Sequence, residues 1–294
     1  MFKKILISTV TASAMLISGA TYAKELRIGA KSYAEQQLLA EMTEQLLNAN
    51  GISAKAMTGM GSSLLRQAME NKQVDLCWEY TGTSLITYNK VTERLGPEET
   101  YERVKALDAK LGMVWLNPSK ANNTYALAKR IGDFEGVNTI SDLAALYKDG
   151  KPMKLASTTE FAKRVDGLLG LQKEYDFKVG RANIVSMHPG LIYPALQDKQ
   201  VDIGVVFSTD GRVASMNFQI LKDDKGFFPS YNMTPVVLKE ALDAEPKLAD
   251  LLNRLSAVLD DDTMQRLNGE VSVDKKSVQE VAEKFLQEKK LIAS

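Results

Sequence analysis

The chain has 294 residues, of which 45% are hydrophobic and 25% are charged, and its 37 basic and 37 acidic side chains leave no formal net charge. This balance excludes the basic field that nucleic acids or anionic membrane surfaces require of a binding protein. The single cysteine excludes an internal disulfide, so packing must hold the fold together. Cys77 lies in the apolar run at 74–78, where we expect a buried structural thiol.

The first 23 residues predict a cleaved export signal. Lys3 and Lys4 precede an apolar run at 5–19, which is shorter than the ~20 residues that span a bilayer. Small residues follow it, and Ala23 stands at the expected cleavage site. We therefore expect residues 1–23 to be removed and the protein to be periplasmic, without a membrane anchor.

Strands and helices alternate after this signal. Residues 25–29, 52–57 and 74–78 read as short strands, and helical spacing of apolar side chains covers 33–49 and the stretch from 59 to 71. Such alternation predicts an α/β fold.

The second helix opens with Gly-Met-Gly-Ser-Ser at 59–63. This segment lacks the Gly-Lys-Ser/Thr ending of a phosphate-binding loop. Its hydroxyls could accept an anion, but we expect them to cap the helix.

An internal repeat divides the chain. Lys-Gln-Val-Asp at 72–75 recurs 127 residues later at 199–202, and each copy stands between a helix and an apolar strand. The first strand ends in Tyr80 and Thr81, and the second ends in Phe207, Ser208 and Thr209. The matching context predicts two similarly built lobes.

The second half continues the alternation, with strands expected at 124–128, 153–156, 184–186, 201–207 and 218–221. A helix is expected to begin near the cap Ser141, and Ser277 with Glu280 predicts a capping box for the last helix.

No flexible linker separates the two halves, which predicts that the chain crosses between the lobes more than once and leaves a cleft there. We expect parallel-rich sheets, with 24–124 and 231–294 forming lobe 1 and 125–230 forming lobe 2.

The residues that enzymes and metal sites need are scarce. The one histidine, His188, excludes a multi-histidine metal site, and no Gly-x-Ser-x-Gly elbow accompanies it. We expect His188 to have a structural role in its turn, and we expect neither a metal nor a cofactor. A periplasmic hydrolase using His188, or a two-lobed transferase of the hydroxymethylbilane type, remains the remote alternative.

Tyrosines stand beside strand ends and turns: Tyr80 ends a strand, Tyr125 begins one, Tyr193 opens a helix and Tyr231 precedes a returning strand. A quaternary ammonium has no N–H to donate, so proteins recognise it with ring faces, each contributing about 0.5–2 kcal/mol. Arg164 follows a strand end, where its planar guanidinium would suit a ligand carboxylate.

Several motifs over nearly the whole mature chain carry a family resemblance. They include Gly-Ala-Lys-Ser-Tyr-Ala-Glu-Gln at 29–36, Glu-Tyr-Thr-Gly-Thr at 79–83, Asn-Asn-Thr-Tyr-Ala-Leu at 122–127 and Phe-Pro-Ser-Tyr at 228–231. With these motifs the chain resembles the substrate-binding proteins of osmoprotectant ABC importers, which serve glycine betaine, choline and related solutes. One departure is Trp78, where relatives often have proline. We expect it to pack in the core.

The resemblance implies a type II periplasmic-binding-protein fold whose chain crosses the hinge twice. It also implies an aromatic cage of Tyr80, Tyr125, Tyr193 and Tyr231, with Arg164 as the carboxylate partner. Asn123 matches a polar position in the cage wall. The weaker candidates for the pocket rim are Lys31, Gln36, Ser62, Ser63, Thr81 and Thr159.

The implied ligand is a small zwitterion or cation, and the implied partner is an inner-membrane ABC permease. We expect a monomer that closes around its ligand. Choline, carnitine or an amino acid in the same cleft remains an alternative to glycine betaine. A purely structural or receptor-docking protein, which would show no ligand-dependent closure, is a third possibility.

Overall fold

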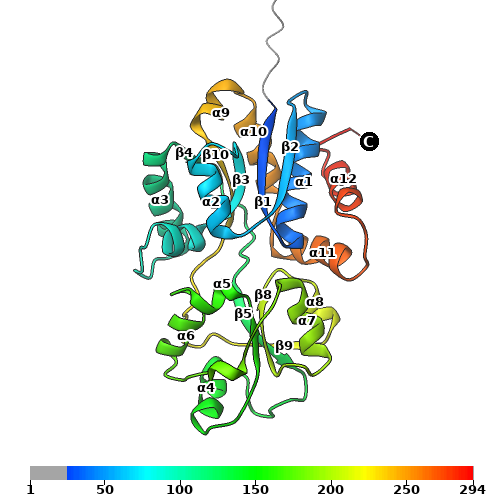
Figure 1. Ribbon diagram of the computed structural model, residues 1–294. Coiled ribbons are helices and arrows are strands. Elements are labelled where there is room, and N and C mark those ends of the chain that lie inside the picture. Colours follow the sequence, from blue (N-terminus) through cyan, green and yellow to red (C-terminus); the bar gives the residue numbers. More distant parts are fainter. Residues whose placement is uncertain (1–24, 294) are drawn as a thin grey trace, which may run out of the picture.

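The computed structural model describes residues 25–293, so the export signal expected at 1–23 lies outside the described residues. The chain forms two lobes, one above the other, each built on a five-stranded sheet with helices on both faces (Figure 1). In spatial order, the sheet of lobe 1 contains β2 (Ala54–Met60), β1 (Leu26–Lys31), β3 (Leu76–Tyr80), β10 (Met233–Leu238) and β4 (Met113–Trp115). The sheet of lobe 2 contains β7 (Ile184–Ser186), β6 (Leu155–Ser157), β8 (Ile203–Phe207), β5 (Tyr125–Arg130) and β9 (Phe218–Leu221). The predicted two-lobed α/β fold is confirmed.

Both sheets are mixed. In lobe 1, β1 pairs in parallel with β2 and β3, whereas β10 is antiparallel to β3 and β4. Lobe 2 repeats this pattern with β6 in parallel and β5 in antiparallel pairings. The expectation of parallel-rich sheets therefore holds only for three strands of each. The reason is that β3 and β8 end at the boundary between the lobes, where β10 and β5 begin as the chain crosses over.

Helices cover the sheets on both faces and bury the two cores. Lobe 1 carries α1 (Ala34–Ala49), α2 (Ser62–Glu70), a π-helical turn (Thr83–Tyr88), α3 (Pro97–Asp108), α9 (Lys239–Ala244), α10 (Leu248–Ala257), α11 (Asp261–Ser272) and α12 (Val278–Glu288). Lobe 2 carries α4 (Ile140–Lys148), α5 (Thr159–Lys163), α6 (Leu168–Glu174), α7 (Pro189–Gln197) and α8 (Arg212–Ser215). Two 3-10 turns, Ala109–Leu111 and Arg181–Asn183, complete the helical segments. Within the described residues, no helix is both long and apolar enough to cross a membrane.

The internal repeat is confirmed as one structural unit used twice. Each copy follows a helix, α2 or α7, and its first residue is left-handed, with φ of 56° and 59°. The N–H of Asp75 then donates to the carbonyl of Arg27 at 2.8 Å, and that of Asp202 donates to the carbonyl of Lys154 at 2.9 Å. Each aspartate carboxylate accepts the N–H of the same partner at 2.8 Å. The repeat therefore sets β3 and β8 in equivalent places, with their last residues facing the other lobe.

Two chain segments, 116–124 and 222–232, connect the lobes and pair with each other. Asn122 and Asn232 form an antiparallel bridge, and the N–H of Asn123 donates to the carbonyl of Tyr231 at 3.2 Å. This short two-stranded ribbon is the hinge. The domain boundaries at 124/125 and 230/231 stay a prediction.

The helix caps differ in part from those expected. Ser277 caps α12 by accepting the N–H of Glu280, as predicted. Helix α4 is instead capped by Thr139, two residues before Ser141, because Thr139 and Asp142 form a reciprocal capping box. Helix α2 has Gly61 at its N-cap and no side-chain cap, so the expected capping role of the 59–63 hydroxyls is wrong.

Trp78 and Cys77 are both buried in the core of lobe 1, as expected. The indole N–H of Trp78 donates to the Thr43 hydroxyl at 2.9 Å, and burial raises the pKa of the Cys77 thiol far above its ordinary value.

Candidate functional site

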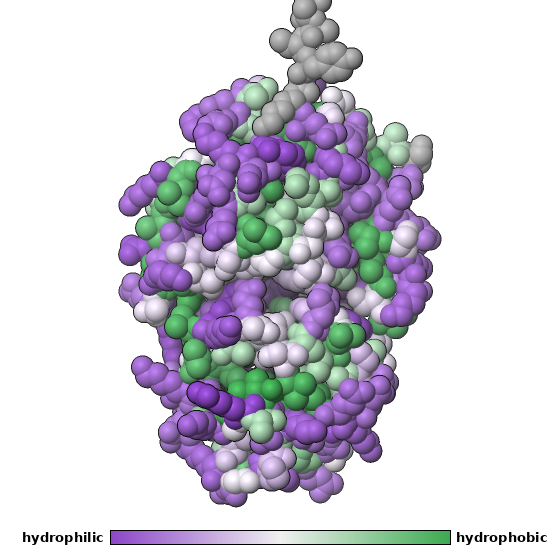
Figure 2. Space-filling view, in the orientation of Figure 1, coloured by the Kyte–Doolittle hydropathy of each residue, from purple (hydrophilic) through white to green (hydrophobic). Residues whose placement is uncertain are grey.

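A small cavity lies between the lobes, where β3, β8 and the hinge meet, and Figure 2 shows the surface hollowed between the lobes. We call it the cage cavity. Its volume of about 140 Å³ is well below the roughly 300–1,000 Å³ of sites for drug-sized ligands, so it suits a small solute. It is lined by Lys31, Ser32, Tyr33, Met60, Gly61, Ser62, Tyr80, Thr83, Asn123, Tyr125, Thr158, Glu160, Pro189, Phe207 and Tyr231.

Five aromatic rings form its walls: Tyr33, Tyr80, Tyr125, Phe207 and Tyr231. Tyr125 stands in the middle, with its ring centre 5.2 Å from that of Phe207 and 5.4 Å from that of Tyr231, which it meets edge-on. Tyr33 stacks on Phe207 at 5.4 Å. Lobe 1, lobe 2 and the hinge each contribute rings, so the cavity is complete only when the lobes lie together.

Hydrogen bonds fix two of these rings. The Tyr80 hydroxyl donates to Glu35 at 2.7 Å and accepts from Gln36 at 3.0 Å. The Tyr231 hydroxyl donates to Asp166 at 2.8 Å. Burial raises the pKa of Tyr125 to about 12 and holds the pKa values of Tyr80 and Tyr231 well above the usual range. All three rings are therefore neutral phenols at physiological pH.

One cationic side chain lines the cavity. Lys31 is the last residue of β1, and its ammonium forms a buried ion pair with Glu79 at 2.6 Å. The same ammonium lies 4.8 Å from the centre of the Tyr80 ring. A charged donor is thus held beside the aromatic walls.

Arg164 was expected to meet a ligand carboxylate, and this role stays a prediction. Its guanidinium is buried but does not line the cage cavity, because it is already bound to Asp166 and to Glu160, the latter at 3.1 Å. It lies 5.7 Å from the centre of the Tyr125 ring. Arg164 therefore supports one wall and holds Glu160 at the cavity, but its donors are occupied.

Tyr193 does not line the cage cavity either, so its expected part in the cage stays a prediction. Its side chain is fully buried in the core of lobe 2. Its hydroxyl accepts the N–H of Phe207 at 3.2 Å, and the Arg212 guanidinium lies 3.8 Å from the centre of its ring. Phe207, rather than Tyr193, supplies the wall from lobe 2.

The remaining candidates divide into two groups. Asn123, Lys31 and Ser62 line the cavity together with Tyr80, Tyr125 and Tyr231, whereas Gln36, Thr81, Ser63 and Thr159 do not. Gln36 is buried behind Tyr80, and Ser63 and Thr159 point to solvent. The Thr81 hydroxyl donates to the Ser230 carbonyl at 3.1 Å and so fastens β3 to the returning crossing segment.

Sequence reasoning missed Tyr33, Phe207, Thr83, Thr158 and Glu160. The repeat could have revealed Phe207, since it lies 127 residues after Tyr80, at the end of the equivalent strand.

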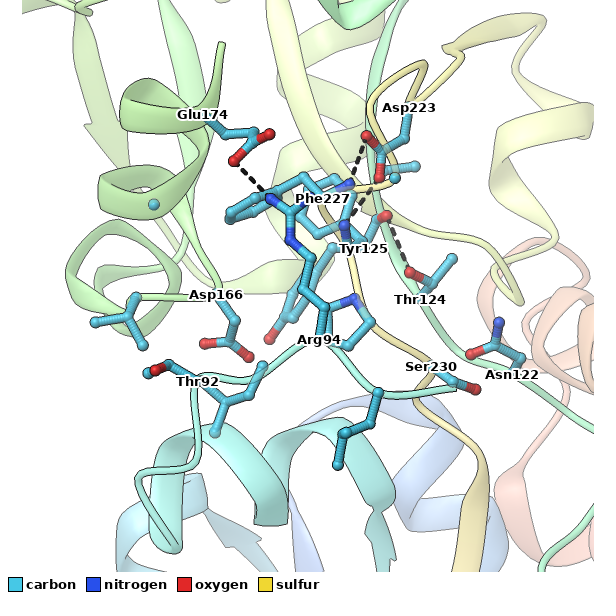
Figure 3. Close-up of a pocket in the computed structure, with 18 of the residues that line it drawn as sticks. Thr92, Arg94, Asn122, Thr124, Tyr125, Asp166, Glu174, Asp223, Phe227 and Ser230 are labelled. Carbon is cyan, nitrogen blue, oxygen red and sulfur yellow. Dashed lines mark hydrogen bonds and ion pairs between the residues drawn. The ribbon is translucent and has the colours of Figure 1, made fainter. Parts of the chain in front are cut away.

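A second and larger space, which we call the hinge groove, lies beside the hinge and has a volume of about 1,090 Å³. Figure 3 shows Arg94 of lobe 1 reaching across it to Glu174 of α6, at 2.5 Å. On its other side, Asp223 accepts the N–H groups of Phe227 and Phe228 at 2.9 and 2.8 Å. Tyr125 borders both spaces, so the hinge groove and the cage cavity share a wall.

His188 has the structural role expected for it. It is the N-cap of α7, and its Nδ1 accepts the N–H of Gly190 at 3.1 Å. Among residues 25–293, no group of three or more His, Cys, Asp or Glu side chains is arranged to hold a metal ion.

A two-lobed fold that encloses a small aromatic cavity defines a solute-binding protein. Residues 24–288 match the family described as the substrate binding domain of the ABC-type glycine betaine transport system. The chain is 40% identical over 286 residues to a glycine-betaine-binding protein of Pseudomonas aeruginosa, covering 95% of this chain and 92% of that protein.

A protein of Helicobacter pylori, named as an ergothioneine transport permease and ergothioneine binding protein, is 31% identical over 269 residues, and the match covers 90% of this chain and 47% of that protein. The crystal structure of a glycine betaine/carnitine/choline ABC transporter protein superposes with a TM-score of 0.72 at 29% identity, covering 91% of this chain and 99% of that one. The chain therefore belongs to the family of substrate-binding domains of ABC-type glycine betaine transport systems.

Proposed function

We propose that this protein captures a quaternary-ammonium compatible solute, glycine betaine or a close relative, in the cage cavity and delivers it to an inner-membrane ABC permease. The observation that carries the proposal is the set of five aromatic rings from both lobes and the hinge around one small cavity. The glycine-betaine-binding relative at 40% identity supports the same ligand class.

The cavity offers the two ends of such a ligand different surroundings. Neutral aromatic faces attract a cation that cannot donate an N–H, by about 0.5–2 kcal/mol for each ring. A carboxylate would lie toward the Lys31 ammonium and the hydroxyls of Ser62 and Thr83, which line the lobe 1 side. Ser62 also begins α2, whose free N–H groups and dipole favour an anion.

A choline-like cation is the second candidate, and one observation favours it. Glu160 lines the cavity while Arg164, the expected carboxylate partner, is bound to Asp166 and to Glu160 itself. A cation without a carboxylate would use the rings and Glu160 and leave Lys31 to its pair with Glu79.

The cellular setting belongs to the same proposal. The signal pattern at 1–23 supports export, and the Helicobacter pylori relative, which is named as both a transport permease and a binding protein, supports a permease partner. The protein acts as a monomer and as a carrier, not as an enzyme. Lobe 1 comprises 24–124 and 231–294, and lobe 2 comprises 125–230, so that the hinge ribbon lies at both boundaries.

A thermal-shift screen tests the ligand class. The mature chain is heated with glycine betaine, choline, carnitine and a set of amino acids at equal concentrations. We expect glycine betaine or a related trimethylammonium compound to raise the unfolding temperature most, because only the folded form binds it. A larger shift with choline would favour the second candidate, and shifts with amino acids alone would contradict the proposal.

A further inference from the structure

Glu35, near the start of α1, has a position that ligand binding alone does not explain. Its side chain is 4% exposed, and its carboxylate accepts four hydrogen bonds. Tyr80 and Asn123 donate to Oε1 at 2.7 and 2.6 Å. Thr209 and Asn268 donate to Oε2 at 2.5 and 3.0 Å. Every side-chain donor is thus a neutral group.

These donors come from every part of the molecule that must move on closure. Tyr80 ends β3 and Asn268 lies in α11, both in lobe 1. Asn123 lies in the first crossing segment, and Thr209 follows β8 in lobe 2. The carboxylate of Glu35 is therefore a point at which both lobes and the hinge meet, and Thr209 is its donor from lobe 2.

No cation balances this charge directly. Within residues 25–293 Glu35 has no salt-bridge partner, and the charged side chains around it are paired with one another. Burial raises the pKa of Glu35, and its hydrogen bonds act in the opposite direction. A carboxylate in such surroundings depends on its donors, since an unsatisfied buried charge is costly. The neighbouring titratable groups are Tyr33, Tyr80, the Lys31–Glu79 pair and the Asp210–Arg212 pair.

We infer that Glu35 is a positioning residue that couples lobe closure to the aromatic cage: it fixes Tyr80 from behind and receives its last donor, Thr209, only when lobe 2 closes. This inference rests on the proposed function and deepens it. In an open form, water would replace the Thr209 hydroxyl. Closure expels that water, and the bond to the charged oxygen gains strength in the drier interior. The ligand draws the lobes together, and the bond from Thr209 to Glu35 forms in the same closed state. Both therefore favour closure.

Thr209→Val tests the coupling with little change of shape, because it removes the hydroxyl and leaves the Thr209 carbonyl, which accepts from Asn268 at 2.9 Å. We expect calorimetry to show glycine betaine bound about tenfold more weakly, as for one lost bond to a charged group. The loss should appear as faster ligand release in stopped-flow measurements, with the association rate unchanged. Thr209→Ser, which restores the hydroxyl, should bind like the wild type.

Glu35→Gln should weaken binding further, since an amide turns an N–H₂ toward one pair of donors. Adding Thr209→Val to Glu35→Gln should then cost less affinity than Thr209→Val costs in the wild type, because the Thr209 hydroxyl no longer meets a charged acceptor. Glu174→Gln is the matched control: it breaks the exposed Arg94 pair that also joins the lobes, and we expect less than a twofold change.

The outcomes separate the two proposals. If the wild type does not bind glycine betaine, the proposed ligand is wrong. If the wild type binds it and Thr209→Val binds equally well, the coupling role is wrong. Additive losses from Glu35→Gln and Thr209→Val would also overturn it. Ligand-free unfolding temperatures, measured for each variant, distinguish weak binding from a damaged fold.

Discussion

At the scale of single residues, the site depends on which aromatic side chain faces the cavity. Tyr80, Tyr125 and Tyr231 do so because each stands at a strand end or on the hinge. Tyr193 belongs to α7, and its helical neighbours Ile192 and Leu196 are buried on the same side against the sheet. Its helical position therefore makes it part of the core of lobe 2.

Tyr193→Phe tests this placement. The change removes the acceptor of the Phe207 N–H and should lower the free energy of unfolding by about 1–2 kcal/mol. Ligand affinity should change less than twofold, because Phe207 lines the cavity and Tyr193 does not. Denaturant unfolding and calorimetry measure the two effects. A tenfold loss of affinity with unchanged stability would return Tyr193 to the cage wall.

The sequence could predict which residues near turns lie at the cavity, but it could not predict which side chains contact one another. Motif positions placed Lys31, Asn123 and three tyrosines at the cavity. Nothing local could reveal that Glu35 meets Thr209 and Asn268, which lie 174 and 233 residues away. The bonds from Arg164 to Asp166 and Glu160 could not be predicted for a similar reason, since they depend on how these carboxylates fold back upon its guanidinium.

At the scale of elements, the turn after β3 positions the Tyr231 wall. Gly82 lies so close to the returning crossing segment that a Cβ there would come within 2.7 Å of the Ser230 carbonyl oxygen and 2.9 Å of the Tyr231 ring. No room exists for a side chain without moving this wall.

Gly82→Ala should therefore displace Tyr231, lower stability by about 1–3 kcal/mol and weaken ligand binding. Gly96→Ala serves as the control, because its nearest neighbour would be 3.7 Å away, at the start of α3. Calorimetry and thermal unfolding compare the two variants. Equal, small effects of both would show that Tyr231 is not held by this contact.

A buried carboxylate ties several elements of lobe 1 together. Asp108, at the end of α3, accepts hydrogen bonds from Arg66 of α2, Asn89 and Trp115 of β4, at 2.9, 3.0 and 2.8 Å. Burial alone would raise the pKa of Asp108, but the bonds from Arg66 and Asn89 bring it below its ordinary value. Its folded-state pKa is thus depressed, so its contribution to stability is present above about pH 4 and is lost as the pH falls further.

Asp108→Asn should remove this contribution, because it leaves Arg66 without its buried partner. At pH 7 we expect a loss of about 3–5 kcal/mol in the free energy of unfolding. The difference from the wild type should narrow below pH 4, where Asp108 of the unfolded wild-type chain takes up a proton before Asp108 of the folded chain does. Urea unfolding at pH 7 and pH 3.5 measures both values, and a difference that is independent of pH would contradict the assignment.

At the scale of the whole molecule, one unit used twice explains the architecture. The Lys-Gln-Val-Asp repeat could predict two lobes because each copy forms the same turn between a helix and a strand. In each copy the aspartate N–H donates to the carbonyl of a residue at the neighbouring strand. The antiparallel pairing of β10 with β3 and of β5 with β8 could not be predicted in the same way, since it depends on where the chain crosses the hinge. That crossing is what brings the two equivalent strand ends, Tyr80 and Phe207, to one cavity.

The most direct test is a calorimetric titration of the mature chain with glycine betaine, repeated for Tyr125→Ala and Tyr125→Phe. The wild type should bind one ligand per chain. Tyr125→Phe keeps a ring at the centre of the cage and should retain most of the affinity, whereas Tyr125→Ala should weaken binding by about 0.5–2 kcal/mol or more. No binding to the wild type, or equal affinity of all three proteins, would contradict capture of a quaternary ammonium by aromatic rings.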